Sequence, residues 1–496
     1  MVAWGLCIPV PDGRTPLKPA PTHTLSRLSA CCLGTLVLLA GCSAPVPVRL
    51  NTDMPAHWQQ ALPVSPKPGA DLAHWWKSWN DTELNALVDE ALAQNLDVAQ
   101  AVLRLQQQKR LSEVSGSAFL PNVSAGVRTL QDVAAQDSYF HASVDVSWDL
   151  GLFGASEAAT RSASADVLDA QAQLHAARVA LVAQVVHRYL DIRQAQRQQA
   201  LLQQRQALDQ RQLQLLQIRQ TQRLGSMQAV EQQQLQIAAA AGQTAMLTEA
   251  QARSAHGLAA LLGRSGPDPR WLQAADATTA MPAAPAISGM PLAAIPADLL
   301  RTRPDIQSAE AAVEHAAAEL GITRAALYPR FTLTGSILYS YNITQNRRNA
   351  ASDKLPVFGP QIDVPLFDWS RRRAQADASE LALQASVKAY RQSVLNGIAD
   401  VESSLAAIGA QEQRRQSLQA TQSILQQRQQ AQTVRQNLGL ESELSTLETR
   451  RSLLQLQSET DTAGFTQALA FVTLYKALGG APLDTVAQSP AKGLQP

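Results

Sequence analysis

The sequence has no thiol beyond residue 42, because its cysteines are Cys7, Cys31, Cys32 and Cys42. The rest of the chain therefore has no disulfide framework, no cysteine metal site and no thiol nucleophile. The eight histidines are scattered, and no HExxH, P-loop, dinucleotide fingerprint or nucleophile elbow is present. We therefore expect no enzyme, no cofactor and no metal site.

The sequence also has no excess of positive or negative charge. The chain has 42 Lys and Arg against 41 Asp and Glu, a formal net charge of +1. This balance argues against a nucleic-acid partner held by a basic field. No run reaches the roughly 18 apolar residues that a membrane-spanning helix requires. A hydrophobic content of 46% argues against a disordered chain.

The cysteines lie where an export signal is expected. A basic residue and a short apolar run precede Leu39-Ala40-Gly41-Cys42, which resembles the cleavage box of bacterial lipoproteins. The resemblance implies that residues 1–41 are a signal peptide with a long proline-rich lead, and that Cys42 carries lipid. Ser43 fits sorting to the outer membrane, and 42–74 would be a lipidated extended segment. The alternative is an ordinary signal peptide in which this cysteine occurs by chance.

Proline is missing from two long runs, 122–266 and 366–481, which are rich in Ala, Gln, Leu and Arg. These residues favour helices, and the apolar ones recur at the coiled-coil period. Each run has one break, at Gly225 or Gly439, where glycine fits a helix end. The sequence predicts long helices over about 156–223 and 371–437, followed by helices over about 226–263 and 440–478. Such lengths indicate a tube or a stalk.

Strict alternation of apolar and polar residues precedes each long helix. The predicted strands cover about 118–130, 139–150, 328–341 and 357–367. Strands of this length with one apolar face are typical of transmembrane barrels. A soluble sheet with one buried face remains the alternative. Because four strands cannot close a barrel and an open edge cannot lie in lipid, the membrane interpretation requires oligomerisation.

The chain is an internal duplication. The segment from Leu92 lines up with the segment from Leu300, and Leu224-Gly225 lines up with Leu438-Gly439. The predicted organisation is a first repeat over 75–263, a connector over 264–296, a second repeat over 297–481 and a tail over 482–496. Each repeat has the order helix, strand, strand, long helix, helix.

Several motifs together give the chain a family resemblance. They are Trp75-Trp76 with Trp79-Asn80-Asp81 and Leu84, Trp148-Asp149-Leu150-Gly151-Leu152-Phe153-Gly154, Ile295-Pro296-Ala297-Asp298-Leu299-Leu300 with Arg303-Pro304-Asp305-Ile306, Tyr328-Pro329 and Leu474-Tyr475-Lys476-Ala477-Leu478-Gly479-Gly480. The chain resembles the TolC-like outer-membrane efflux factors, in their lipoprotein (OprM- and NodT-like) branch. The resemblance implies a homotrimer with a twelve-stranded β-barrel in outer-membrane lipid, continued by a periplasmic α-helical barrel. The partners it implies are a periplasmic membrane-fusion adaptor and an inner-membrane pump.

The resemblance also implies a periplasmic gate on the helix after the second glycine break. Aligned from Gly439, the gate's apolar ring falls on Leu444, its acidic ring on Glu448 and its partner arginine on Arg451. An apolar collar can close a pore by dewetting, and a carboxylate ring holds cations. This sequence has Glu448 where the family commonly has Asp. The alternative is that Glu448 and Arg451 form an ordinary i,i+3 surface pair.

The function expected is therefore passive export of drugs or other small toxic compounds across the outer membrane. Two alternatives remain from the sequence. One is an outer-membrane duct for type I protein secretion, and the other is a lipid-anchored periplasmic coiled-coil protein without a pore.

Overall fold

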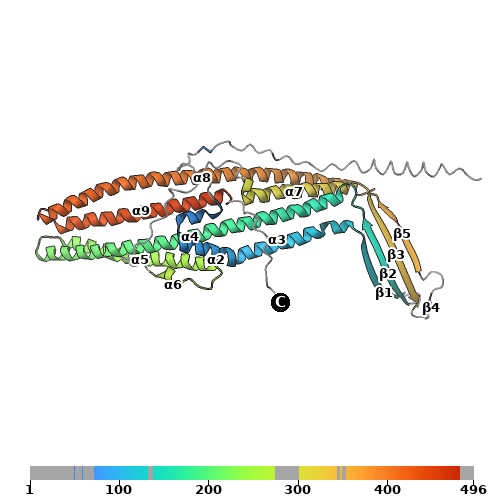
Figure 1. Cartoon of the computed structure of the whole chain (residues 1–496), viewed down its shortest axis with the longest axis horizontal. Helices are drawn as coiled ribbons and strands as arrows, with labels where there is room; N and C mark the ends of the chain where they lie inside the picture. Colours follow the sequence, from blue (N-terminus) through green and yellow to red (C-terminus); the bar gives the residue numbers. More distant parts are fainter. Residues whose placement is uncertain are drawn as a thin grey trace, which may run out of the picture. The chain divides into compact units, whose positions relative to one another are not determined.

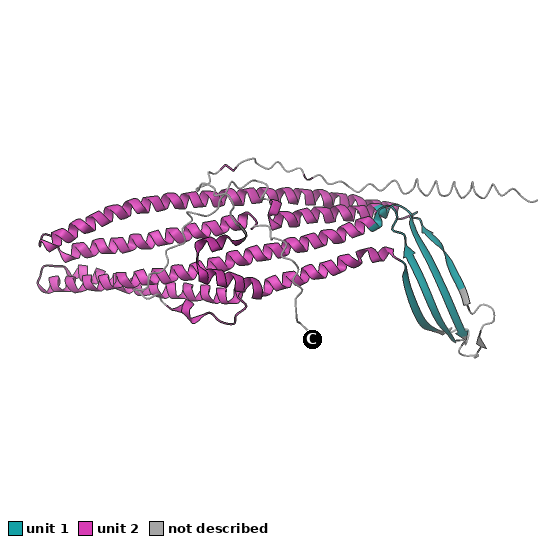
Figure 2. Cartoon of the chain, in the orientation of Figure 1, with its two compact units in different colours: residues 1–46, 121–156, 325–366 teal, residues 47–120, 157–324, 367–496 magenta. Residues whose placement is uncertain are grey.

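A computed structural model of the chain describes residues 50, 58–59, 72–131, 138–273, 301–342, 347–348 and 354–480. The chain divides into two compact units (Figure 2). One contains residues 1–46, 121–156 and 325–366, and the other contains residues 47–120, 157–324 and 367–496. The expected signal peptide, Cys42, most of 42–74 and of the connector, and the tail lie outside the described residues.

The second unit is helical (Figure 1). Its elements are η1 (Leu72–Trp79), α2 (Thr82–Gln94), α3 (Leu96–Ser115), η2 (Gly116–Phe119), α4 (Ala155–Thr221), α5 (Met227–Leu261), α6 (Pro269–Leu272), α7 (Pro304–Ala325), α8 (Trp369–Asn437) and α9 (Glu443–Ala477). None of the described helices is both long enough and apolar enough to span a membrane.

The first unit is an antiparallel sheet (Figure 1). Its strands are β1 (Asn122–Gln131), β2 (Ser138–Asp149), β3 (Arg330–Asn342), β4 (Arg347–Arg348) and β5 (Lys354–Asp363). The order is β1-β2-β3, with β4 and β5 both pairing with β3. The mainly helical fold with antiparallel strands is confirmed.

Three details of the sheet differ from the sequence prediction. The two-residue strand β4 was not predicted. Phe119 belongs to the 3-10 helix η2, so β1 begins later than expected. Strand β5 runs from Lys354 to Asp363, so it begins and ends earlier than expected, and residues 364–367 lie outside it. The prediction was wrong at these ends because the apolar alternation continues past the last paired residues, Asn122 with Ser147 and Arg330 with Asp363.

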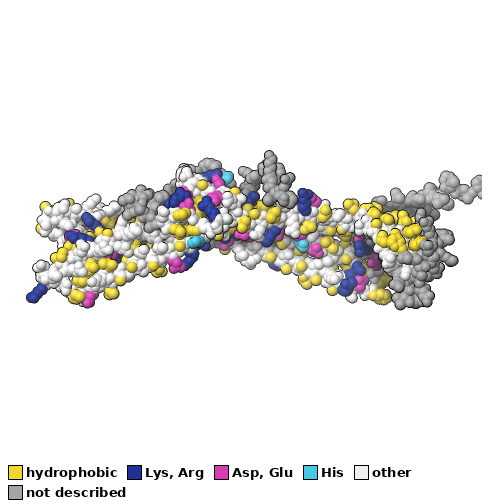
Figure 3. Space-filling view, turned by 90° about the horizontal axis from the view of Figure 1, so that it is seen from below, with side chains coloured by type: hydrophobic (Ala, Val, Ile, Leu, Met, Phe, Trp, Pro, Cys, Tyr) yellow, Lys and Arg dark blue, Asp and Glu magenta, His cyan; other side chains and the backbone are white. Residues whose placement is uncertain are grey.

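The sheet has two chemically different faces. One row of paired residues crosses it as Val123, Val146, Gly335 and Phe358, all without polar side chains. A neighbouring row contains Ser124, Asp145 and Ser336 and ends at Val357 on β5. The Asp145 carboxylate accepts hydrogen bonds from the Oγ atoms of Ser143 (2.8 Å) and Ser336 (2.6 Å). In the space-filling view, hydrophobic side chains gather over the strands, at the right-hand end (Figure 3).

Both outer strands have exposed apolar side chains. They are Val123 and Val127 on β1, and Val357, Phe358 and Ile362 on β5. The backbone groups on these edges have no strand partner within the described part of the chain. Because an unpaired edge is a template for another strand, the sheet is incomplete as a monomer.

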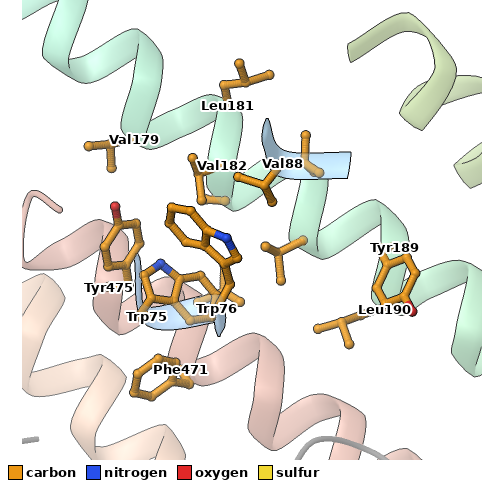
Figure 4. Packing of buried hydrophobic residues seen from close by; sticks show 14 of the residues in the cluster. Trp75, Trp76, Val88, Val179, Leu181, Val182, Tyr189, Leu190, Phe471 and Tyr475 are labelled. Atoms are coloured by element: carbon orange, nitrogen blue, oxygen red, sulfur yellow. The ribbon is translucent and has the colours of Figure 1, made fainter. Parts of the chain in front are cut away.

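The core of the helical unit centres on two tryptophans of η1 (Figure 4). Trp75 lies 5.3 Å from the Phe471 ring and 5.1 Å from the Tyr475 ring, both on α9. Trp76 lies edge-on to Trp75, and both are almost fully buried. The first and last segments of the described chain are thus joined by aromatic packing.

The sequence Trp79-Asn80-Asp81 makes the turn into α2. Asn80 has a φ of 54°, a left-handed conformation that asparagine tolerates. The Asp81 side chain caps α2 by accepting hydrogen bonds from the backbone N–H groups of Glu83 and Leu84. The other Asp81 oxygen accepts a 2.5 Å hydrogen bond from the Tyr189 hydroxyl. This motif therefore fixes η1 and α2 against α4.

The two helical hairpins, α4–α5 and α8–α9, turn in the same way. Arg223 and Gly439 have φ values of 57° and 72°, and their N–H groups bond to the carbonyls of Gln220 and Gln436. The structure thus aligns Arg223 with Gly439, an offset of 439 − 223 = 216. The sequence alignment of Gly225 with Gly439 was therefore wrong by two residues.

Helix α9 ends where its backbone closely approaches that of Arg303. Gly479 has a φ of 79°, and a Cβ there would lie 2.6 Å from the Cα of Arg303. Arg303 is buried and donates hydrogen bonds to the carbonyl of Ala477 and to the carboxylates of Asp305 and Asp400. One arginine thus joins the start of α7 and the end of α9 to the middle of α8.

We expect Gly479→Ala to destabilise the protein by about 2 kcal/mol or more, because alanine is strained at positive φ and its Cβ collides with backbone. Gly409→Ala in α8 is the matched control, since a Cβ there has nothing within 4 Å. The control should stabilise by about 0.5–1 kcal/mol, the helix penalty of glycine. Thermal unfolding of detergent-solubilised protein, followed by circular dichroism, measures both, and equal midpoints would contradict the argument.

Candidate functional site

The expected gate residues lie in the first turns of α9. Ser442 caps this helix by accepting a 3.3 Å hydrogen bond from the backbone N–H of Ser445. Leu444 is half-buried and Glu448 is exposed. Because they are four residues apart on one helix, they lie on one face, as the sequence predicted.

Arg451 does not pair with Glu448 in the described structure. Its guanidinium instead donates a 2.7 Å hydrogen bond to the Gln236 side chain on α5 and lies 3.7 Å from Asp209 Oδ1 on α4. The alternative interpretation, an i,i+3 surface pair, is therefore wrong. Arg451 connects α9 to the other hairpin.

Asp209 is the residue that the sequence analysis missed. Its side chain is 1% exposed, and its carboxylate lies between Arg451 and Arg205 Nε, which is 3.6 Å away. Within the described residues, neither carboxylate oxygen accepts a hydrogen bond. A buried carboxylate is stable only when hydrogen bonds replace its lost hydration. Asp209 has two nearby positive charges but no such hydrogen bonds. A signal was available, since Asp209 is the sole acidic residue between Asp191 and Glu231.

Two further ion pairs connect α4 to α9. Arg211 forms two hydrogen bonds, of 2.8 and 3.0 Å, with the Glu443 carboxylate. These hydrogen bonds hold the pKa of Glu443 below its usual value, against an opposing effect of desolvation and with smaller help from the charges of Arg211 and Arg450. Deeper in the bundle, Arg197 Nε lies 2.6 Å from Asp461. The helix that carries the candidate gate is therefore tied to α4 along several turns.

A polar cavity of about 740 Å³ lies beside this contact. Its walls come from α4, α5, α8 and α9, which lie side by side (Figure 1). Charged side chains in its lining are Glu448, Glu459, Arg451 and Arg205, and five glutamines and three leucines are among the others. Water therefore has access to the exposed face of the candidate gate.

Metal binding finds no support in the part of the chain that the structure describes. There, no group of three or more His, Cys, Asp or Glu residues is arranged to hold a metal ion.

Comparison with known proteins gives the family of the chain. The model of the outer membrane efflux protein family matches residues 87–264 and 295–480, one segment in each repeat. The chain is 30% identical to the pyoverdine export outer membrane protein OpmQ of Pseudomonas aeruginosa, covering 92% of this chain and 96% of that protein. It is 27% identical to the toluene efflux pump outer membrane protein TtgC of Pseudomonas putida, covering 92% and 96%.

Solved structures show the same fold. The outer-membrane channel OprN is 24% identical, with a TM-score of 0.75 over 89% of this chain and 99% of that chain. The outer membrane protein VceC of Vibrio cholerae is 22% identical, with a TM-score of 0.69 over 84% and 99%. The expected family and the expected outer-membrane location are both confirmed. The chain belongs to the outer membrane efflux protein family, whose members are outer-membrane channels and not enzymes.

Proposed function

We propose that three copies of this chain form a passive duct across the outer membrane. The duct receives small toxic compounds from an inner-membrane pump through a periplasmic membrane-fusion adaptor. The observation that carries this proposal is the two-faced sheet with unpaired apolar edges on β1 and β5. Such a sheet is stable in lipid only when its edges are closed by other copies.

Three copies of the four long strands give twelve, enough to leave a lumen, whereas eight are just filled by side chains. The polar rows of the sheet would then face water and the apolar rows lipid. A coiled-coil protein without a pore does not require such a sheet, so the sheet favours the duct over that alternative. The relatives named for export of pyoverdine and toluene favour small compounds over secreted proteins.

The internal repeat predicts how two copies pair. Asn122 and Arg330 are equivalent (offset 330 − 122 = 208), and their partners Ser147 and Asp363 are equivalent (offset 363 − 147 = 216). In the β2–β3 ladder, Asp145 pairs with Ser336. The equivalent of Asp145 is Gln361 (145 + 216), and the equivalent of Ser336 is Arg128 (336 − 208). Gln361 of one copy should therefore pair with Arg128 of a second copy. Strand β5 would therefore pair antiparallel with β1 of that copy.

We expect the double variant Gln361→Cys and Arg128→Cys to form disulfide-linked dimers and trimers in outer membranes. The chain suits this test because no cysteine follows Cys42. Electrophoresis without reductant gives the number of linked chains. The control is Ile362→Cys with Arg128→Cys, because one residue along a strand points to the opposite face. Absence of linked trimers in the first variant would refute the duct.

We also propose that Leu444 and Glu448 form the periplasmic gate and that Arg451 holds their helix in place. The exposed carboxylate of Glu448 beside the apolar Leu444 supports this arrangement. Three copies around an axis would bring an apolar collar next to a ring of three carboxylates, which together restrict passage. The tie from Arg451 to Asp209 would position both rings.

Leu444→Ala and Glu448→Ala should each raise passive leakage, because they widen the collar or remove the charge ring. Asp209→Asn should do the same, because it removes the charge that holds Arg451 against α4. Conductance in planar bilayers and cellular sensitivity to large antibiotics measure the leak. Glu249→Ala, in an exposed pair with Arg253, is the control. Unchanged conductance in the first two variants would remove the gate assignment.

Finally, we propose that Cys42 is lipidated and anchors the mature chain. Cys42→Ala should abolish incorporation of labelled palmitate, because the box that precedes it resembles a lipoprotein signal. The matched control is Cys32→Ala, a cysteine inside the expected signal peptide, which should keep full labelling. Labelling of the Cys42→Ala variant at the normal level would contradict the proposal.

A further inference from the structure

We propose that the exposed apolar side chains Met227, Leu235 and Met246 of α5, here called the α5 face, form an interface with α8 of a second copy of this chain. The inference rests on the proposed trimer, and it names the helix surfaces that meet. It also infers that this contact has no ion pairs, whereas the contact between the two hairpins of one chain is ionic.

The internal repeat supplies the first step. Helices α5 and α9 both have 35 residues, and they begin at Met227 and Glu443. Their offset is 443 − 227 = 216, the same as between the left-handed residues Arg223 and Gly439. Strands β2 and β5 give the same offset through their ladders. Residues 216 apart are therefore equivalent from the second strand of each repeat to its last helix.

The second step is the contact that the chain already shows. Helix α9 meets α4 through three ionic contacts, Glu443 with Arg211, Arg451 with Asp209, and Asp461 with Arg197. In a ring of alternating hairpins, the equivalent contact joins α5 of one copy to α8 of the next. Adding or subtracting 216 then gives the residues that meet in this contact between copies.

None of these charge pairs has a charged counterpart. Glu443 and Arg211 become Met227 and Gln427, while Arg451 and Asp209 become Leu235 and Leu425.

The third pair follows the same rule. Asp461 and Arg197 become Ala245 and Gln413. Beside them, Gln198 and Thr462, which are hydrogen-bonded within the chain, become Arg414 and Met246. The aliphatic stem of an arginine can cover a methionine while its head stays in water.

The exposure of the α5 face supports the same conclusion. Leu235 and Met246 are each 71% exposed, and Met227 is 54% exposed. On α8, Ile424 is 65% exposed next to the half-buried Leu425. Apolar side chains spaced along one helix are the expected surface of a partner helix. The face thus fits α8 of a second copy, whose matching positions are apolar or uncharged apart from Arg414.

The two contacts therefore differ in how they respond to solvent. The contact within a chain is ionic and contains a carboxylate without hydrogen-bond partners, so salt and loss of charge weaken it. The equivalent positions between copies contain no pair of opposite charges, so salt has no ion pair to screen there. Around the ring, salt-sensitive and salt-insensitive contacts would alternate.

The test is a second cysteine pair, Leu235→Cys with Leu425→Cys, oxidised in outer membranes. We expect linked dimers and trimers at about tenfold the yield of the control, because disulfides need close Cβ atoms. The control is Ile237→Cys with Leu425→Cys, since two residues turn a helix by about 200°. Equal yields in both variants would overturn the interface.

The double variant Gln361→Cys and Arg128→Cys distinguishes failure of the proposed duct from failure of the proposed interface between α5 and α8. Linked trimers through Gln361→Cys and Arg128→Cys, without links through Leu235→Cys and Leu425→Cys, would overturn the interface and leave the duct. Absence of both would overturn the trimer and the interface together.

A charge exchange provides a measurement that does not depend on oxidation. Leu235→Asp should reduce the trimer fraction in detergent, and adding Leu425→Arg should restore it by recreating an ionic contact. The restored trimer should dissociate at high salt, whereas the natural one should not, as light scattering in detergent would show. A natural trimer that dissociates at high salt, or a double variant that stays monomeric, would overturn the apolar interface.

Discussion

A β-sheet with two unpaired edges cannot remain in lipid, and this constraint governs the rest of the molecule. Each unpaired N–H or C=O in hydrocarbon costs several kcal/mol, so the edges must be closed. A chain with four long strands cannot close its own sheet, and β1 and β5 present apolar side chains at both edges. The need for further copies is thus a property of the single chain.

The internal duplication turns this constraint into specific contacts. Each repeat contributes two long strands and one helical hairpin, so a contact seen once within the chain predicts a second contact between copies. The two are not identical, because Asp209 and Arg451 have Leu425 and Leu235 as counterparts. The backbones of the two hairpins match at an offset of 216, while side chains at equivalent positions are charged in one and uncharged in the other.

The candidate gate shows where sequence reasoning succeeds and where it stops. Helical spacing was enough to place Leu444 and Glu448 on one face of α9. The same reasoning suggested Glu448 as the partner of Arg451, and the structure instead gives Asp209 and Gln236. Local spacing cannot identify a partner some 240 residues away, because only tertiary packing brings α4 and α5 against α9.

The sequence by itself determined the classes of element, their order, the duplication and the family. Periodicity, proline placement and turn residues are local properties, and they suffice to distinguish strands from helices. Only the tertiary structure decided that Arg223 and not Gly225 takes the left-handed turn, that Asp209 is buried, and that the side chains of the α5 face are exposed. These features depend on which surfaces meet across long sequence separations, and no local pattern encodes that.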